Sequence, residues 1–232
     1  MIEFPYEYSN LLYCRPPGTL VEGVNSGNTL VAIVQHHRFA FFYWNFWSKE
    51  KKMHPDLFSI DHHHDLCPPE HCEVEDLNGL DTSNDERVSQ FCWARLRSTN
   101  DSQTLSAVYL DILSDVHVEC KMHWMGKNHF DDKDGRPHNV RVYDDHSKFL
   151  EWLSSSSSLI LDLDMDYFLT NYDEDVREKV IWSPQDVVSR ISFVKSNWKK
   201  IKGITIATEP THCGGILNSY ELLRVILTYL RT

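Results

Sequence analysis

Five of the seven residues between Ser59 and Asp65 carry side chains that can bind a metal ion, namely Asp61, His62, His63, His64 and Asp65. The apolar residues just before them predict the end of a buried strand. Because alternate side chains of a strand share a face, we expect Asp61, His63 and Asp65 to point the same way. Two carboxylates and an imidazole suit a divalent ion such as Mn²⁺, Fe²⁺ or Zn²⁺. The alternative is a polar loop whose histidines are solvated.

A second acidic pattern occurs far along the chain, where Asp162 and Asp164 directly follow the apolar residues 159–161. Their alternate spacing again places two carboxylates on one face of a strand. Acidic residues in so apolar a segment need partners, because a buried carboxylate without any is costly. The alternative, that both are helix caps or solvated loop acids, therefore fits poorly.

His36 and His37 follow the β-branched run of residues 29–34, and either of them adds an imidazole to the two acidic patterns. The three segments together supply six potential ligands, four of them carboxylates. One ion is usually satisfied with fewer protein ligands. The sequence therefore predicts two ions that share bridging carboxylates, as in two-metal hydrolytic sites.

The elements that position these residues are predicted to alternate between strands and helices along the chain. Predicted strands cover residues 29–34, 57–61, 105–113, 159–168 and 201–207, and predicted helices cover 39–47, 85–96, 145–153, 183–194 and 216–230. Residues 1–29 are expected to be a lead-in that is irregular or forms short strands, with residues 10–14 apolar enough to pair as one, and residues 126–138 a surface loop. Such alternation predicts an α/β fold with three α/β/α layers and a mostly parallel sheet, which binds ligands beyond the carboxyl ends of its strands.

Composition limits the class of protein further. The 232 residues fit a single domain, 1–232, and the formal charge of −11 argues against nucleic acid as a partner and suits a cationic substrate. No apolar run is long enough to cross a membrane, and the first residues do not form a secretory signal, so we expect a cytoplasmic protein. The six cysteines are scattered and are expected to be reduced; Cys67 and Cys72 flank the histidines but make only a weak zinc pattern.

The order of these motifs resembles the arginase/deacetylase superfamily of ureohydrolases: a strand-end histidine, D-x-H-x-D at Asp61, D-x-D at Asp162, then Glu209. The sequence from Asp162 to Phe168, D-x-D-x-D-Y-F, is more closely similar to the family of uncharacterised proteins UPF0489. That family includes bacterial peptide arginases, which convert arginine residues of ribosomally made precursor peptides to ornithine. The resemblance covers residues 31–215 and implies an arginase-like fold.

The resemblance also implies a binuclear Mn²⁺ site and a role for each matching residue. One Mn²⁺ would be held by His37 or His36 with Asp61, Asp65 and Asp162, and the other by Asp61, His63, Asp162 and Asp164. Asp61 and Asp162 would bridge the two ions. Glu209 would bind the substrate guanidinium, whose planar donors match a carboxylate. Asp164 would orient the attacking water.

A histidine would return a proton to the leaving amine, and we expect His71 in this role, with His62, His64 and His212 as rivals. The expected function is thus a manganese-dependent hydrolase acting on arginine residues of a precursor peptide, with release of urea. The alternatives are a ureohydrolase or amide deacetylase that acts on a small molecule, and a non-enzymatic protein that binds metal or peptide. The oligomeric state is not predicted.

Overall fold

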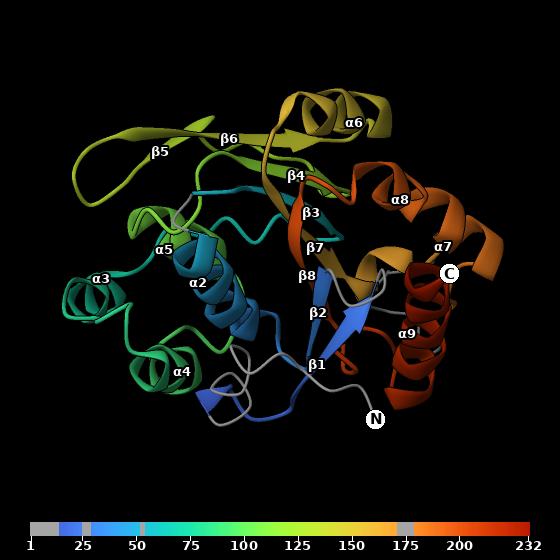
Figure 1. Ribbon diagram of the computed structural model, residues 1–232, viewed down its shortest axis with the longest axis horizontal. Helices are drawn as coiled ribbons and strands as arrows, with labels where there is room; N and C mark the ends of the chain where they lie inside the picture. Colours follow the sequence, from blue (N-terminus) through green and yellow to red (C-terminus); the bar gives the residue numbers. More distant parts are fainter. Residues whose placement is uncertain (1–13, 25–28, 52–53, 171–178) are drawn as a thin grey trace.

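The computed structural model describes residues 14–24, 29–51, 54–170 and 179–232, whose strands form one eight-stranded sheet (Figure 1). In chain order the strands are β1 (Thr19–Val24), β2 (Thr29–Val34), β3 (Asp56–Asp61), β4 (Val116–Cys120), β5 (His129–Asp131), β6 (Pro137–Tyr143), β7 (Leu159–Asp164) and β8 (Ile201–Ala207). Their order across the sheet is β1-β2-β8-β7-β3-β4-β6-β5. The pairs β1–β2 and β5–β6 are antiparallel and all other pairs are parallel, which confirms the predicted mostly parallel sheet.

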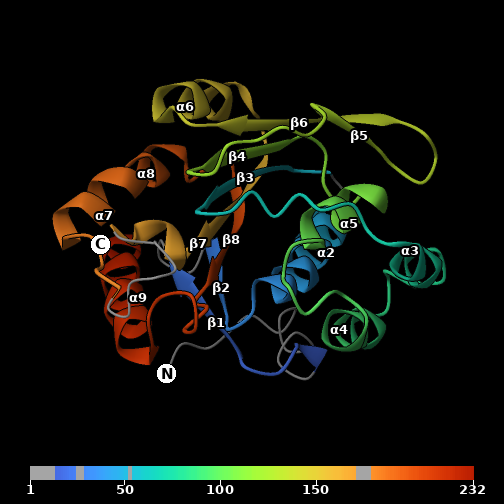
Figure 2. The same cartoon turned by 180° about the vertical axis from the view of Figure 1, so that it is seen from behind.

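Helices cover both faces of this sheet (Figures 1 and 2). On one face lie η3 (His37–Phe39), α2 (Ala40–Lys51), α3 (His71–Asn78), α4 (Asp85–Ala94) and α5 (Gln103–Tyr109), and on the other α6 (His146–Ser155), α7 (Pro184–Ile191), α8 (Phe193–Asn197) and α9 (Ile216–Arg231). The short helix η4 (Met165–Phe168) follows β7. Each face has its own apolar core, so the predicted three-layer α/β/α fold is confirmed.

Strand β2 shows why an uninterrupted apolar run predicts a central strand. All six of its residues are buried. Ala32 and Val34 pack in the core under α2, whereas Val31 and Ile33 pack in the core under α9. A strand covered on both faces needs apolar side chains at every position, because alternate residues point into different layers.

The predicted strand at residues 105–113 is wrong, because residues 103–109 form helix α5. Its residues from Gln103 to Val108 are all buried, so no polar face marks the helical period in the sequence. The predicted loop at 126–138 contains the short strand β5, and the lead-in contains the edge strand β1. Strands β4 and β6 were not predicted; both carry polar residues among their apolar ones. The suggestion that residues 10–14 could pair as a strand falls almost wholly outside the described residues.

Strands β3 and β7 are parallel neighbours whose chains leave the sheet in opposite directions. After β3 the chain continues into α3, α4 and α5 on one face, and after β7 it continues into α7 and α8 on the other. In open α/β sheets ligands bind where the chain diverges in this way, beyond the carboxyl ends of the strands. The topology therefore selects the end of β3 and β7, where two of the predicted motifs occur.

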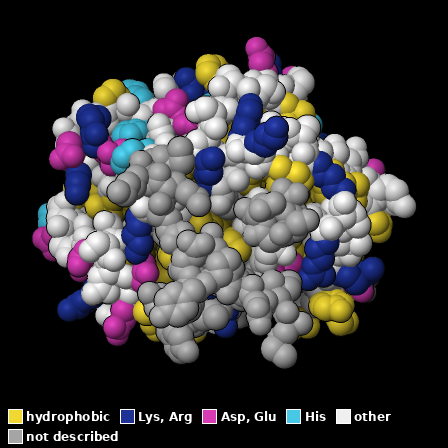
Figure 3. All heavy atoms as spheres, in the orientation of Figure 1, with side chains coloured by type: hydrophobic (Ala, Val, Ile, Leu, Met, Phe, Trp, Pro, Cys, Tyr) yellow, Lys and Arg dark blue, Asp and Glu magenta, His cyan; other side chains and the backbone are white. Residues whose placement is uncertain are grey.

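The surface carries acidic and basic side chains interspersed on the face drawn in Figure 3. All six cysteines are free thiols. Among the described residues, no helix combines the length and the apolar character that a membrane span requires.

Candidate metal centre

Asp61 and Asp164 are the last residues of the adjacent strands β3 and β7, and their carboxylates come together at one edge of the sheet. Both side chains point into the layer of α2, because Leu57 and Ile160, at the same alternation, pack in that core. Asp61 is 1% exposed and Asp164 3%. Two carboxylates so deeply buried need a positive partner.

His37 supplies an imidazole to this pair from the turn that follows β2. Its ring is buried, and its Nδ1 lies 2.9 Å from an oxygen of Asp65, 3.1 Å from Asp164 and 3.6 Å from Asp61. With the described residues, neither His37 Nδ1 nor Asp61 Oδ2 makes a hydrogen bond of regular geometry. Ligand atoms of His37, Asp61 and Asp65 lie within 4.8 Å of one another, an arrangement that a cation between them would complete.

A second group of ligand atoms shares Asp61 with the first. Asp61, His63 and Asp166 also have ligand atoms within 4.8 Å of one another. Nδ1 of His63 is 3.2 Å from Asp166 Oδ2, and Asp166 is 1% exposed. Two groups that share one carboxylate form the pattern of a binuclear site with a bridging ligand.

Electrostatics in the cluster favour a bound cation. Burial and the neighbouring carboxylates Asp65, Asp164 and Asp166 raise the pKa of Asp61 well above its ordinary value. Burial and Asp166 likewise raise the pKa of Asp164. Burial alone would lower the pKa of His37, but the carboxylates around it raise it well above its usual range. The cluster must bind protons or metal to offset its charge, so a donor set of carboxylates and imidazoles fits divalent metal ions.

The prediction that Asp162 is a bridging ligand disagrees with its contacts. Its oxygens accept hydrogen bonds from Ser59 Oγ at 2.8 Å and from the hydroxyl of Thr205, and Oδ2 lies 2.8 Å from His37 Nε2. Asp162 thus lies behind the imidazole, one pleat further inside the sheet than the ligand atoms. Asp166, which was not predicted as a ligand, joins the ligand group instead. The alternating acids at 162, 164 and 166 contain the D-x-D pattern twice, once at 162–164 and once at 164–166. The second pair lies at the end of β7, and Asp166 has a ligand atom close to those of Asp61 and His63.

Of the two neighbouring histidines, only His37 lies among these carboxylates. His36 is exposed and packs its ring edge-on against Phe39, with the ring centroids 5.6 Å apart. His71, which was predicted as the proton donor, lies on the surface of the molecule. Its side chain is 90% exposed on α3, where it faces Glu75 at 3.5 Å. His71 is not among the residues that line the cavity described below, so we do not place it in the site.

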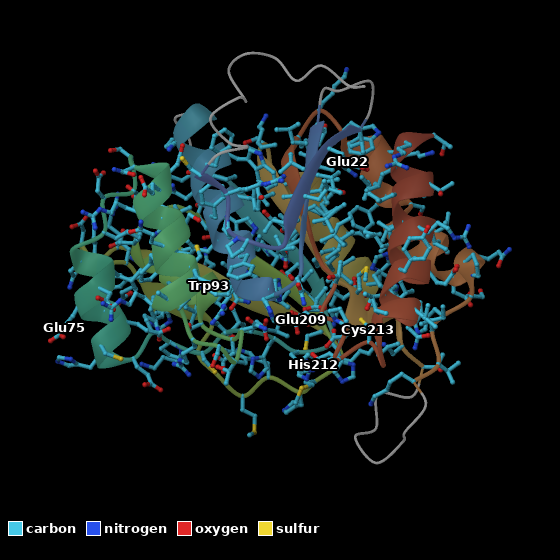
Figure 4. The ribbon with its side chains drawn as sticks, turned by 90° about the horizontal axis from the view of Figure 1, so that it is seen from below. Glu22, Glu75, Trp93, Glu209, His212 and Cys213 are labelled. Atoms are coloured by element: carbon cyan, nitrogen blue, oxygen red, sulfur yellow. The ribbon has the colours of Figure 1, made fainter. Side chains whose placement is uncertain are left out.

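Glu209 lies on the loop between β8 and α9, at the position labelled in Figure 4, and it contacts the candidate ligand His37. Its Oε1 accepts hydrogen bonds from the backbone N–H of His37 at 2.9 Å and from Asn100 Nδ2 at 2.6 Å. Its backbone has a φ of 28°, a conformation that non-glycine residues seldom adopt and that often marks a functional position. These contacts fix the carboxylate close to His37.

A cavity of about 260 Å³ opens at this point. It is lined by His63, His64, Asp65, Cys67, Thr99, Asn100, Asp101, Met122, Asp164, Glu209 and His212. Predicted ligands, the predicted substrate anchor and two of the rival histidines therefore border one space. Figure 4 shows Glu209, His212 and Cys213 close together on this side of the molecule, with Trp93 further along.

Two residues of the site gave no sequence signal. Asn100 holds Glu209, and Gln103 donates from Nε2 to Asp65 Oδ2 at 2.9 Å. Both come from the segment around α5 that we predicted as a strand or left unassigned. Only the packing of α5 against the sheet brings them to the cavity, so no local pattern could have identified them.

A third group with ligand-like spacing consists of Asp111, Asp132 and His138, near β5 and β6. The guanidinium of Arg136 already contacts both carboxylates, at 2.8 Å to Asp132. A cation is thus present in that group, and we do not assign a metal to it.

No protein-family model matches the sequence, so membership of UPF0489 stays a prediction. The search of curated proteins also found no match to the sequence. One similar solved structure is an agmatine ureohydrolase of Thermoplasma volcanium, with 15% identity and a TM-score of 0.47, and the match covers 88% of this chain and 63% of that one. An arginase of Helicobacter pylori has 11% identity and a TM-score of 0.45, covering 86% of this chain and 73% of that one. An arginase from Bacillus subtilis has 14% identity and a TM-score of 0.40, covering 83% of this chain and 76% of that one. The chain thus spans less than two thirds of the first of these proteins.

Proposed function

We propose that the protein is a hydrolase that uses two divalent metal ions, Mn²⁺ in our assignment, to cleave a C–N bond of a guanidine. The proposed substrate is the arginine side chain of a precursor peptide, and the products are urea and an ornithine residue. The observation that carries the proposal is the pair of ligand groups sharing Asp61 beside a cavity that contains Glu209.

The ligands divide between two positions. One ion would be held by His37, Asp61, Asp65 and Asp164, and the other by Asp61, His63, Asp164 and Asp166. Oxygen-rich sets with one imidazole each suit Mn²⁺. Two such ions supply Lewis acidity and lower the pKa of water, which provides a nucleophile at neutral pH.

Substrate recognition would fall to the acidic cavity wall. Asp65, Asp101, Asp164 and Glu209 line the cavity and attract a cation. Oε1 of Glu209 is held by His37 and Asn100, so its carboxylate is fixed in orientation before the substrate arrives. A fixed carboxylate can receive two parallel N–H groups from a planar guanidinium, which a compact ammonium ion does not offer.

His212 is the residue that we assign to proton transfer, in place of His71. It lines the cavity, and its Nε2 lies 3.5 Å from Glu209 Oε2. Its side chain is 48% exposed, so it can exchange protons with solvent. A histidine beside the bound guanidinium can donate a proton to the departing amine.

The test is an incubation of the purified protein with Mn²⁺ and either free arginine or an arginine-containing precursor peptide. Mass spectrometry should show a loss of about 42 Da per arginine in the peptide, with urea released in equal amount. Turnover of free arginine instead would favour the small-molecule ureohydrolase. No mass change and no urea in either reaction would contradict the hydrolase.

A further inference from the structure

Asp162 is a fully buried acid that neither ligand group uses. It lies on the same face of β7 as Asp164, two residues earlier, and is 1% exposed. An ionised carboxylate in such a place is costly unless hydrogen bonds compensate it. Its surroundings therefore indicate what the carboxylate does.

Neighbouring strands supply two of its hydrogen bonds. Ser59 Oγ on β3 donates to Oδ2 at 2.8 Å, and Thr205 on β8 donates from its hydroxyl to Oδ1. Trp44 Nε1 on α2 is 3.1 Å from the Thr205 oxygen. Because an indole N–H can only donate, Thr205 accepts from it and must direct its own hydrogen to Asp162.

The third partner of Asp162 is the predicted metal ligand itself. His37 Nε2 lies 2.8 Å from Asp162 Oδ2, on the side of the ring opposite the ligand group. A carboxylate that already takes two hydroxyl donors is an acceptor, so the hydrogen of the imidazole lies on Nε2. The lone pair of Nδ1 is then directed at Asp61, Asp65 and Asp164.

We propose that Asp162 is a positioning residue, which fixes the ring of His37 and its Nε2–H tautomer so that Nδ1 binds metal. The proposal rests on the metal centre of the proposed function. Hydrogen bonds from Thr205 and Ser59 fix the orientation of the carboxylate, which in turn accepts a hydrogen bond from the imidazole. The ring of His37 is therefore already oriented for metal binding and does not have to rotate. Partners of this kind typically change metal affinity by 10- to 100-fold.

The first test is Mn²⁺ binding by Asp162→Asn, followed through the electron paramagnetic resonance signal of free Mn²⁺. The amide keeps the size of the side chain but is a weaker acceptor for the imidazole N–H. We expect the variant to bind Mn²⁺ about 10- to 100-fold more weakly, while the number of ions bound at saturation stays as in the unmodified protein. Unchanged affinity would overturn the proposal, and loss of one ion at saturation would restore Asp162 as a ligand.

Glu73→Gln is the matched control, because Glu73 is another buried carboxylate that accepts several hydrogen bonds. It makes no contact with the ligands among the hydrogen bonds of the described residues. Glu73→Gln should lower thermal stability and leave Mn²⁺ affinity within about threefold. An equal loss of affinity in both variants would show that general destabilisation is responsible and would overturn the proposal.

A second measurement detects the tautomer of His37 in the unmodified protein. In the ¹⁵N-histidine-labelled protein loaded with Zn²⁺ as a diamagnetic probe, the His37 Nε2–H proton should resonate far downfield, because it is bonded to a carboxylate. The resonance is assigned by its absence in His37→Gln. Finding the proton on Nδ1 would overturn the tautomer assignment. Absence of any metal binding by the unmodified protein would contradict the proposed function, and with it this inference.

Discussion

Asp166 lies in the short helix η4, whereas Asp61 and Asp164 are the last residues of strands β3 and β7. Its carboxylate faces His63, and hydrogen bonding to that imidazole offsets the burial and lowers its pKa. In the proposed site Asp166 belongs to only one of the two ligand groups. Its removal should therefore affect one metal position and not both.

We expect Asp166→Ala to reduce the bound Mn²⁺ from two ions per chain to one, because the ligand group around His37 keeps its own donors. Metal content is measured by plasma mass spectrometry after equilibrium dialysis. His36→Ala is the control and should retain both ions, since His36 is exposed and outside either group. Two ions in Asp166→Ala would show that Asp166 is not a ligand.

Glu209 gives a prediction about substrate and not about metal. Glu209→Gln keeps an oxygen for the hydrogen bonds from His37 and Asn100 but removes the negative charge. A charge-assisted hydrogen bond contributes roughly 1.5–3 kcal/mol, so kcat/KM for the arginine-containing peptide should fall by about 10- to 100-fold. Mn²⁺ content should be unchanged. A variant with full kcat/KM would remove Glu209 from substrate recognition.

At the scale of the elements, helix α2 packs directly on strand β8. Gly203 of β8 faces Trp47 of α2, and a Cβ atom placed on Gly203 would lie 2.3 Å from the indole ring. Glycine is therefore required for the close packing of helix on strand. The short helix η3, which contains His37, leads directly into α2, so we expect this contact to influence where the imidazole lies.

Gly203→Ala should destabilise the protein by about 1–3 kcal/mol through overpacking, measured as the free energy of unfolding in urea. Gly79→Ala serves as the control. A Cβ at Gly79 would meet its nearest atom at 3.7 Å, which is ordinary contact. Equal stability of the two variants would contradict the proposed role of the Gly203 contact.

The elements also explain how much of the site could be predicted. Strands β2, β3, β7 and β8 are buried on both faces, so their apolar runs could be recognised in the sequence. Asp61, Asp164 and Glu209 could then be predicted as site residues because they are polar and lie at or just after the ends of these strands. Helix α5 is buried on nearly all sides, so its sequence does not show the alternation of apolar and polar faces typical of a helix. Asn100 and Gln103 were therefore not predicted as residues of the site. Sequence spacing cannot show how deep in the sheet a residue lies, so it did not show that Asp162 contacts His37, Ser59 and Thr205 behind the ligand atoms.

At the scale of the whole molecule, acid should weaken the fold through a histidine outside the site. His117 on β4 is buried, its ring stacks on Phe58 with centroids 4.4 Å apart, and its Nδ1 is 2.8 Å from the hydroxyl of Tyr143. Burial, reinforced by the charge of Arg141, lowers its pKa to about 4. The folded state therefore binds a proton less readily than the unfolded chain, whose histidine keeps an ordinary pKa near 6.5.

Because the folded-state pKa is the lower one, His117 contributes stability above about pH 6.5 that is lost as the pH falls toward 4. The full effect is on the order of 3 kcal/mol. Urea unfolding of the protein and of His117→Phe at pH 7 and pH 5, with chelator present, isolates this contribution. We expect stability to fall less in the variant. An identical fall would assign the acid sensitivity to other groups.

Mn²⁺ should stabilise the whole fold, because the ligand groups join segments that follow β2, β3 and β7 and that separate on unfolding. In a protein with a formal charge of −11, the buried acids at this edge repel one another until a cation binds. A ligand that binds only the folded state adds about 2.7 kcal/mol at a concentration of 100 Kd. The unfolding temperature should therefore rise with Mn²⁺ concentration and return with chelator. The rise should be smaller in Asp61→Asn, which weakens the ligand shared by both groups; an equal rise in that variant would place the stabilising ions elsewhere on the protein.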